Sequence, residues 1–147
     1  MLRVPLHQLD AALPVPGYAR EGDAGADLIA RVDTVLACRG GRAVVPTGVA
    51  VAIPAGYAGL VLPRSGLAVR HGVTCLNAPG LVDAGFRGEL RVVLVNHDLQ
   101  RDYTVSRGDR IAQLVLIRVE EVDFELVSED SLGESERGMG GFGHTGT

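Results

Sequence analysis

The chain has 147 residues, enough for a domain with a buried hydrophobic core, and 46% of them are hydrophobic. Its formal net charge of −4 argues against a general nucleic-acid surface, because proteins with such a surface usually carry a basic face. No apolar run approaches the length needed to cross a bilayer, and the first residues lack the pattern of a signal peptide. We therefore expect a cytoplasmic protein.

All 14 basic residues are arginine, and the chain contains no lysine. Schiff-base catalysis and the lysine of a P-loop are therefore excluded. Any phosphate group would have to be held by arginine side chains, backbone N–H groups or a metal ion. The two cysteines, Cys38 and Cys75, are isolated and have no histidine at metal-ligand spacing, so we expect each to be a reduced thiol in the core.

The first expected strand begins within GDAGADL (22–28). It comes after a glycine turn, and Asp27 stands where the strand begins. An aspartate in such a turn usually caps its own backbone, although its carboxylate could also serve a site. Residues 42–63 are rich in valine and are broken by Pro-Thr-Gly and Pro-Ala-Gly. This pattern is typical of short strands joined by tight turns.

A short helix is predicted within PRSGLAVRHG (63–72), because Pro63 ends the preceding strand and Ser65 is a suitable N-cap. The free N–H groups of Gly66 and Leu67 would then lie beside Arg64. A helix N-terminus next to an arginine attracts anions, although the same residues also suit a simple capped turn.

A hairpin is predicted in LNAPGLVDAGFRGEL (76–90), with Leu81–Val82 and the residues from Arg87 onward as its arms and 83–86 as its turn. The backbone edge of such a hairpin could read the edge of a base. Asp83 could act as a general base, and Phe86 could stack on a sugar. The alternative is an ordinary Asp-Gly turn with a buried phenylalanine.

Residues 88–98 form the next predicted strand. Residues 102–127 predict a hairpin that turns at Arg107-Gly108-Asp109 and continues as a long strand with a late bend. Gln113 is the one polar residue in an apolar run there, so it should face a different environment from its neighbours. With 20 glycines and little helical periodicity, the chain is expected to be all-β, as a barrel or jelly roll.

The composition shifts towards Ser, Glu and Gly from about Ser128, so we expect residues 1–127 to form the domain and 128–147 a flexible C-terminal arm. The arm ends in ERGMGGFGHTGT (136–147). It is either a frayed terminus or a flap, in which glycine-rich backbone wraps a phosphate, Arg137 pairs with it and Phe142 covers a base.

Taken together and in this order, AGAD, PRSGLA, NAPGLVDAGFRGEL, RGDRIAQL and RGMGGFGHTG resemble the five motifs of the trimeric dUTP pyrophosphatases, or dUTPases. The resemblance implies a homotrimer of distorted jelly-roll barrels whose active sites are shared between chains, each closed by the arm of a neighbouring subunit. It also implies Mg²⁺-assisted hydrolysis of dUTP to dUMP and pyrophosphate, which keeps uracil out of DNA and supplies dUMP for dTMP synthesis.

The same resemblance assigns roles to individual residues. Asp83 matches the carboxylate that activates the attacking water, and Asp27 matches an acidic residue near the metal, acting through water. The remaining positions match substrate contacts: Arg64, Ser65, Gly66 and Gln113 with the phosphates from a neighbouring subunit; Asn77, Gly80 and Leu81–Asp83 with the uracil; Phe86 with the sugar; Arg91 with the substrate; Arg137, Gly143, His144 and Thr145 with the γ-phosphate; and Phe142 as a ring stacked on the uracil.

Two positions depart from the family pattern. Phe86 stands where the family usually has tyrosine, which keeps the ring face and removes a phenol hydrogen bond. His144 stands where the family usually has serine, which removes one hydroxyl contact to the phosphates and adds a group that titrates near pH 7.

Two other functions are weighed against hydrolysis. A dCTP deaminase looks similar in fold, but its family carries a catalytic Glu where this chain has Val93. A nucleotide-sensing protein on the same barrel need not keep a general base, whereas Asp83, Arg64 and Arg137 are all present here. Because a triphosphate bears about four negative charges, Mg²⁺ and these arginines could neutralise it while Asp83 orients a water.

Overall fold

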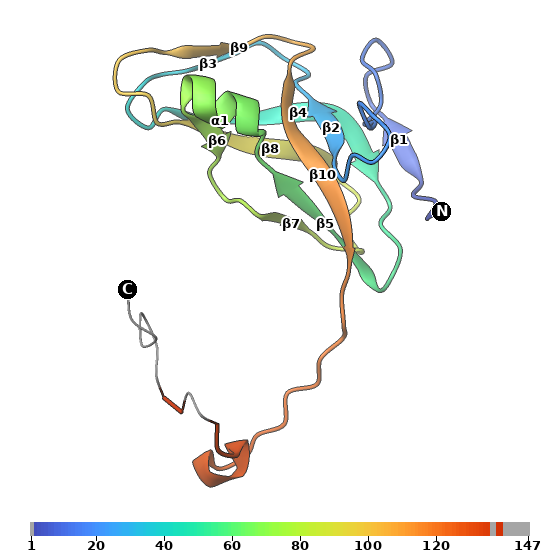
Figure 1. Cartoon of the computed structure of the whole chain (residues 1–147). Coiled ribbons are helices and arrows are strands. Elements are labelled where there is room, and N and C mark those ends of the chain that lie inside the picture. Colours follow the sequence, from blue (N-terminus) through green and yellow to red (C-terminus); the bar gives the residue numbers. More distant parts are fainter. Residues whose placement is uncertain (1, 136–137, 140–147) are drawn as a thin grey trace.

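Ten strands and one short α-helix make up the part of the chain that the structure describes, residues 2–135 and 138–139 of a computed structural model (Figure 1). The strands are Leu6–Gln8 (β1), Ala26–Ile29 (β2), Thr34–Leu36 (β3), Arg42–Val51 (β4), Tyr57–Leu62 (β5), Val73–Cys75 (β6), Gly80–Val82 (β7), Glu89–Asn96 (β8), Tyr103–Val105 (β9) and Arg110–Arg118 (β10). The helix α1 covers Ser65–His71, and a 3-10 helix, η1, covers Glu129–Leu132.

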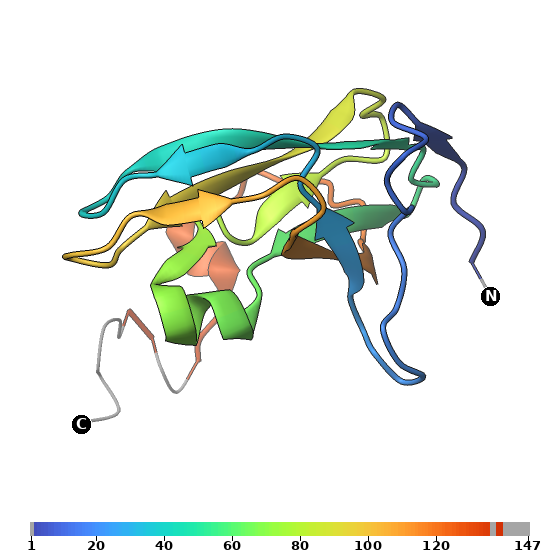
Figure 2. The same ribbon diagram turned by 90° about the horizontal axis from the view of Figure 1, so that it is seen from above.

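Two four-stranded antiparallel sheets enclose the core, with strand orders β1-β4-β8-β6 and β2-β10-β5-β7 (Figures 1 and 2). A two-stranded ribbon of β3 and β9 contacts the first sheet through β3. Both sheets contribute to one hydrophobic cluster, which includes Val45 and Leu94 from the first sheet and Leu28 and Ile111 from the second. This is the two-sheet antiparallel arrangement of a jelly roll, and the predicted all-β class is confirmed.

Both predicted hairpins are wrong. β7 pairs with β5, whereas β8 pairs with β4 and β6, so the segment 83–88 crosses from one sheet to the other. The turn at Arg107–Asp109 is present, with Gly108 at a φ of 95°. The strands on either side of it do not pair with each other, because β9 pairs with β3, and β10 pairs with β2 and β5. The alternation of side chains identifies a strand and does not choose its partner.

The short helix is confirmed, with one correction at its start. Arg64 is the N-cap, in an extended conformation without a side-chain cap bond, and Ser65 is already helical. Gly72 ends the helix in the left-handed region at a φ of 64°, and its N–H donates to the carbonyls of Leu67 and Ala68. This C-cap turns the chain directly into β6.

An ion-pair network fastens the N-terminal segment to the barrel. Arg107 donates to both carboxylate oxygens of Asp10, at 2.6 and 3.0 Å, and to the backbone oxygen of Arg31. The Arg31 side chain in turn pairs with Asp10 and with Glu89, at 3.5 and 3.3 Å. The Arg107 guanidinium holds the pKa of Asp10 at about 2, well below its ordinary value.

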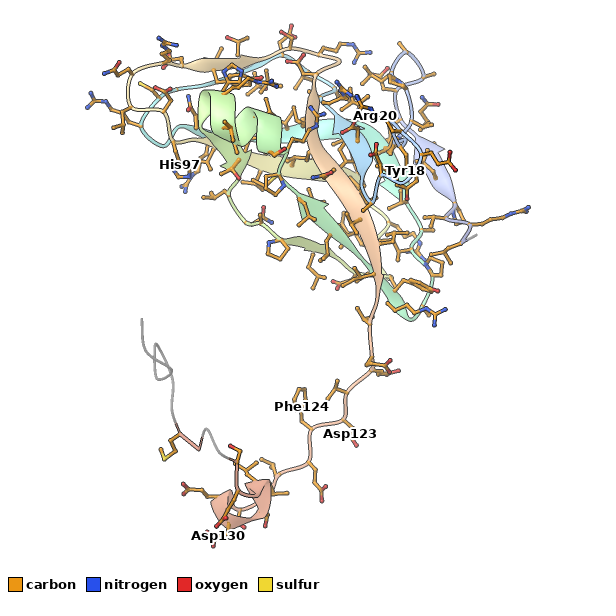
Figure 3. All side chains as sticks on the ribbon, in the orientation of Figure 1. Tyr18, Arg20, His97, Asp123, Phe124 and Asp130 are labelled. Carbon is orange, nitrogen blue, oxygen red and sulfur yellow. The ribbon has the colours of Figure 1, made fainter. Side chains whose placement is uncertain are left out.

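After β10 the chain runs as an extended segment away from the barrel (Figures 1 and 3). Among the described residues, the last backbone hydrogen bond between this segment and the barrel is donated by the N–H of Val119 to the carbonyl of Gly56. Residues 119–135 are all exposed. Along it, apolar Val122, Phe124 and Leu126 alternate with acidic residues, and the Phe124 side chain is 88% exposed. The predicted long strand after Arg107–Asp109 therefore stops at Arg118.

The cysteines differ in their surroundings. Cys75 lies in the core cluster, as predicted, and burial raises the pKa of its thiol to about 11. Cys38 is only partly buried, so the expectation of a core thiol is wrong for this residue. Among the helices of residues 2–135 and 138–139, none has both the length and the apolar character required of a membrane span.

Candidate active site

The predicted site residues of the barrel gather around two separate pockets. The first, the β7 pocket, has a volume of about 440 Å³ and is lined by Leu81, Val82, Asp83, Phe86 and Arg91. The second, the arginine pocket, has a volume of about 370 Å³ and is lined by Asp27, Arg64, Ser65, Gly66 and Gln113. No lining residue is common to both pockets. Within the described part of this one chain, the predicted base and the predicted phosphate ligands therefore form two groups.

The position of Asp83 follows from the end of β7. The strand stops at Val82, and Asp83 is the next residue, exposed at the start of the crossing segment. The N–H of Phe86 donates to the carbonyl of Asp83 at 3.1 Å, which closes the turn. Arg87 donates to the carbonyls of Ala84 and Phe86 and holds the same turn from its other side. Asp83 therefore stands on a turn that is hydrogen-bonded on both sides, and its carboxylate forms no ion pair with any described residue.

The Phe86 ring lies over Gly88. A β-carbon built on Gly88 would lie 2.7 Å from Cζ of Phe86, so a larger residue there would displace the ring. The phenylalanine is 43% exposed. The alternative of a buried phenylalanine in an ordinary turn is therefore wrong, and a ring face is available at the pocket wall.

One backbone edge of β7 has no partner among the described strands, because β7 is the last strand of its sheet. Gly80 and Val82 face inward, while the Leu81 side chain is 64% exposed. Asn77 does not line the pocket, but its Nδ2 would lie 3.3 Å from a β-carbon built on Gly80. The structure thus brings Asn77 against β7, beside a row of peptide groups that can form further hydrogen bonds.

In the arginine pocket, a row of side chains crosses the second sheet. The central strand β10 places Gln113 opposite Asp27 of β2 on one side and opposite Leu62 of β5 on the other. Directly opposed residues of antiparallel strands point to the same face, so Asp27 and Gln113 are neighbours. Arg64 follows Leu62 by two residues and reaches the same place.

Asp27 is held between two arginines. Nε of Arg64 lies 3.1 Å from one carboxylate oxygen, and Nη1 of Arg110 lies 3.4 Å from the other. The carboxylate is therefore engaged with these side chains, and the alternative in which Asp27 caps its own backbone is wrong. Instead Asp23 does so, since its Oδ2 accepts from the N–H of Arg20 at 2.8 Å.

Gln113 is fixed by its surroundings. Its Nε2 donates to the carbonyl of Pro63 at 3.0 Å, and a β-carbon built on Gly25 would lie 2.6 Å from its Oε1. Only glycine at position 25 leaves room for this amide. The prediction that Gln113 faces a different environment from its apolar neighbours is confirmed, because it lines the pocket while Ala112 and Leu114 are buried in the core.

Two arginines in or beside this pocket were missed by sequence reasoning. Arg110 pairs with Asp27 from 83 residues away, a contact that no local pattern signals. Arg70 also lines the pocket, and its spacing of four residues from Gly66 on one helix could have indicated this. The remaining predicted residues Arg137, Phe142, Gly143, His144 and Thr145 lie outside the described residues.

The described side chains contain no cluster of three or more His, Cys, Asp or Glu residues that could hold a metal ion. Asp27, which pairs with Arg64 at 3.1 Å, and Gln113 are side chains of the pocket that carry oxygen atoms suited to a metal. Mg²⁺ usually keeps several waters and binds through one or two carboxylates together with substrate phosphates. The carboxylates of Asp23 and Asp27 line the pocket, and so few protein ligands fit a metal held mainly by the substrate.

A sequence profile of the dUTPase family matches residues 11–146. The chain belongs to the dUTPase family. It is 57% identical over 145 residues to the deoxyuridine 5'-triphosphate nucleotidohydrolase of Thermobifida fusca (strain YX), with 99% of this chain and 79% of that protein covered. The family resemblance drawn from the five motifs is confirmed.

Solved dUTPases have the same fold. The dUTPase of Staphylococcus bacteriophage 80alpha with dUpNHpp superimposes with a TM-score of 0.87 at 28% identity, covering 100% of both chains. A variant dUTPase from phage phi11 of S. aureus superimposes with a TM-score of 0.77 at 26% identity, covering 87% of this chain and 98% of that one. That structure is described as revealing how a structural Mg(II) ion is coordinated.

Proposed function

We propose that this protein is a dUTP diphosphatase that hydrolyses dUTP to dUMP and pyrophosphate. The observation that carries the proposal is the free carboxylate of Asp83 beside an exposed strand edge, in a member of the dUTPase family that also carries a pocket rich in arginine. The matched relative is named for the same reaction. Such an enzyme would keep uracil out of DNA and supply dUMP for dTMP synthesis, and a cytoplasmic location stays a prediction.

In the proposed reaction, Asp83 is the general base. It accepts a proton from a water that attacks the α-phosphorus in line with the departing pyrophosphate. A base must be free to take the proton, and Asp83 has no ion pair among the residues described. Asp27 is unsuited to this role, because its carboxylate is already paired with Arg64 and Arg110.

The β7 pocket is proposed to hold the nucleoside. The free edge of β7 offers peptide donors and acceptors to the uracil, and Asn77 adds a side-chain amide beside Gly80. The Phe86 ring over Gly88 would stack on the deoxyribose and leave no room for a 2′-hydroxyl. Arg91, on the wall of the same pocket, is exposed and could contact the substrate.

The arginine pocket is proposed to hold the phosphates. Arg64, Ser65, Gly66 and Gln113 line it, and Arg137 with Gly143–Thr145 and Phe142 would close over the triphosphate and uracil. When bound, Mg²⁺ would supply positive charge that neutralises the phosphates. Asp27 would hold its water shell, which fits a carboxylate already oriented by two arginines.

The two pockets are proposed to meet across subunits of a homotrimer. Among the described residues of one chain they share no lining residue, and in the proposed trimer the β7 pocket of one chain faces the arginine pocket of another. The exposed alternation of Val122, Phe124 and Leu126 also suits a segment that pairs with a neighbouring chain. Residues 128–147, the proposed arm, could span roughly 65 Å at about 3.3 Å per residue.

The direct test of the activity is pyrophosphate release by the purified protein from dUTP, with dCTP and UTP as controls. Release from dUTP alone is expected. Ammonia release from dCTP would instead support the deaminase alternative, which Val93 disfavours because this position on β8 carries no carboxylate. Binding of dUTP without turnover would support the nucleotide-sensing alternative.

The shared site is tested by mixing two inactive variants. Asp83→Asn and Arg137→Ala homotrimers should each be nearly inactive, because every site carries one lesion. If a site takes its Asp83 and its arm from different chains, random co-assembly in equal amounts should restore roughly a quarter of the sites. Mixed trimers that form and stay inactive would contradict sharing and leave the hydrolase proposal intact.

A further inference from the structure

We propose that Arg70 of α1 is a further substrate-binding residue, which supplies an unneutralised positive charge to the polyphosphate chain in the arginine pocket. This inference rests on the proposed function, since dUTP provides that chain. It starts from the position of the guanidinium: Arg70 lines the pocket together with Arg64, Ser65 and Gly66. Arg70 lies in the last turn of the helix, yet its side chain reaches back to the first turn.

Gly66 is the reason that the guanidinium can lie there. A β-carbon built on Gly66 would lie 2.8 Å from Nη2 and 3.5 Å from Cζ of Arg70. Gly66 has no left-handed φ, so its backbone does not require glycine. The glycine therefore leaves open the space that the Arg70 guanidinium occupies.

The charges of the pocket distinguish Arg70 from the other arginines. Arg64 and Arg110 share the single carboxylate of Asp27. Asp23 and Asp27 both line the pocket, and neither lies within 4.0 Å of the Arg70 guanidinium. Within residues 2–135 and 138–139, Arg70 has no ion pair and no side-chain hydrogen bond. Its donors are thus available for phosphate oxygens, to which an arginine can donate two parallel bonds.

The competing explanation is structural. A cation in the last turn of a helix stabilises the helix through its dipole, and Arg70 could serve only that purpose. The two explanations predict different results for ligand binding. A structural role changes the melting temperature and leaves polyphosphate affinity unchanged at temperatures where the protein is folded.

The first experiment compares Arg70→Gln with the wild type in binding inorganic tripolyphosphate and dUpNHpp, by calorimetry at low and high salt. Arg70→Gln should weaken both ligands by about tenfold at low salt, as expected for one lost charge-assisted hydrogen bond. The difference should shrink at high salt because the charge is partly exposed. Arg42→Gln, which removes an exposed arginine outside the pocket, is the matched control and should bind like the wild type.

The second experiment tests the contact with Gly66. Gly66→Ala should displace the guanidinium and weaken tripolyphosphate binding in the wild-type background. In the Arg70→Gln background the same substitution should cost markedly less, because the displaced group is already absent. Equal costs in both backgrounds, or unchanged binding in Arg70→Gln, would overturn the proposal.

These results are separable from the proposed activity. If the wild type fails to hydrolyse dUTP, the proposed function is wrong, and the tripolyphosphate comparison still tests whether Arg70 binds an anion. If the wild type is active and Arg70→Gln matches it in both KM and tripolyphosphate affinity, this inference alone is wrong. Arg70→Lys adds a further check, since it keeps the charge and loses the planar fork, and should recover part of the affinity.

Discussion

The β7 pocket and the arginine pocket are built by different physical means. The β7 pocket depends on backbone: an unpaired strand edge, a turn closed by Phe86 and Arg87, and a ring placed over a glycine. The arginine pocket depends on charged side chains, with Asp27 held between Arg64 and Arg110. Peptide groups at fixed spacing can read the shape of a base, whereas a flexible polyphosphate needs charge placed in advance.

This contrast also separates where chemistry and affinity should reside. The carboxylate of Asp83 is in the β7 pocket, and the arginine pocket is lined by Arg64 and Arg70. Substitutions in the first should therefore change turnover, and those in the second should change binding.

The largest effect is expected for Asp83→Asn. The variant should fold and bind dUpNHpp with near-normal affinity, while kcat falls by about two to four orders of magnitude, because a general base acts in the transition state. Single-turnover and steady-state kinetics with dUTP measure this. Turnover within tenfold of the wild type would remove Asp83 from the role of base.

The next largest effect is expected in the arginine pocket, for Asp27→Asn. Without the carboxylate, Arg64 and Arg110 lose the group that orients them, so kcat/KM for dUTP should fall by about tenfold, mainly through KM. Asp23→Asn removes a carboxylate of the same pocket that forms no ion pair with the described arginines, and it is the matched control. A loss confined to kcat would contradict the division between the two pockets.

A smaller effect is expected for sugar and base discrimination in the β7 pocket. UTP and dTTP should be poor substrates, because the Phe86 ring opposes a 2′-hydroxyl and the narrow strand edge opposes a 5-methyl group. Phe86→Tyr should raise the preference for dUTP over UTP by about a few-fold, if the phenol restores a hydrogen bond. The measurement is kcat/KM for each nucleotide. Equal kcat/KM for UTP and dUTP would refute the steric argument.

The smallest effect on activity is expected at Asp10, which lies in neither pocket. Its folded pKa of about 2 is below the ordinary value of 3.8, so its ion pair stabilises the fold above pH 4 and the contribution is lost as the pH falls through 2. Asp10→Asn should lower the melting temperature at pH 7 and flatten its decline in acid, with dUTP turnover unchanged at 25 °C. If the melting temperature of Asp10→Asn declines in acid as steeply as that of the wild type, the network contributes little to stability.

Sequence reasoning found the local features and missed the long-range ones. It located α1, the start of β2 to within one residue of Asp27, and the special environment of Gln113, because glycine, proline and alternation act over a few residues. It missed the Asp27–Arg110 pair, and it joined β7 to β8 and β9 to β10 as hairpins. Those errors have one cause: strand partners are chosen by burial of whole sheets, which no short stretch records.

The strand order has a consequence for how the chain becomes this barrel. Among the described strands, no two that are consecutive in sequence are hydrogen-bonded to each other. Pairing must therefore await the closure of long loops, which makes folding slow, on the scale of milliseconds to seconds for such topologies. During synthesis, only β5 and β7 of the second sheet can pair early, whereas β2 has no partner until β10, the last of the described strands, has left the ribosome.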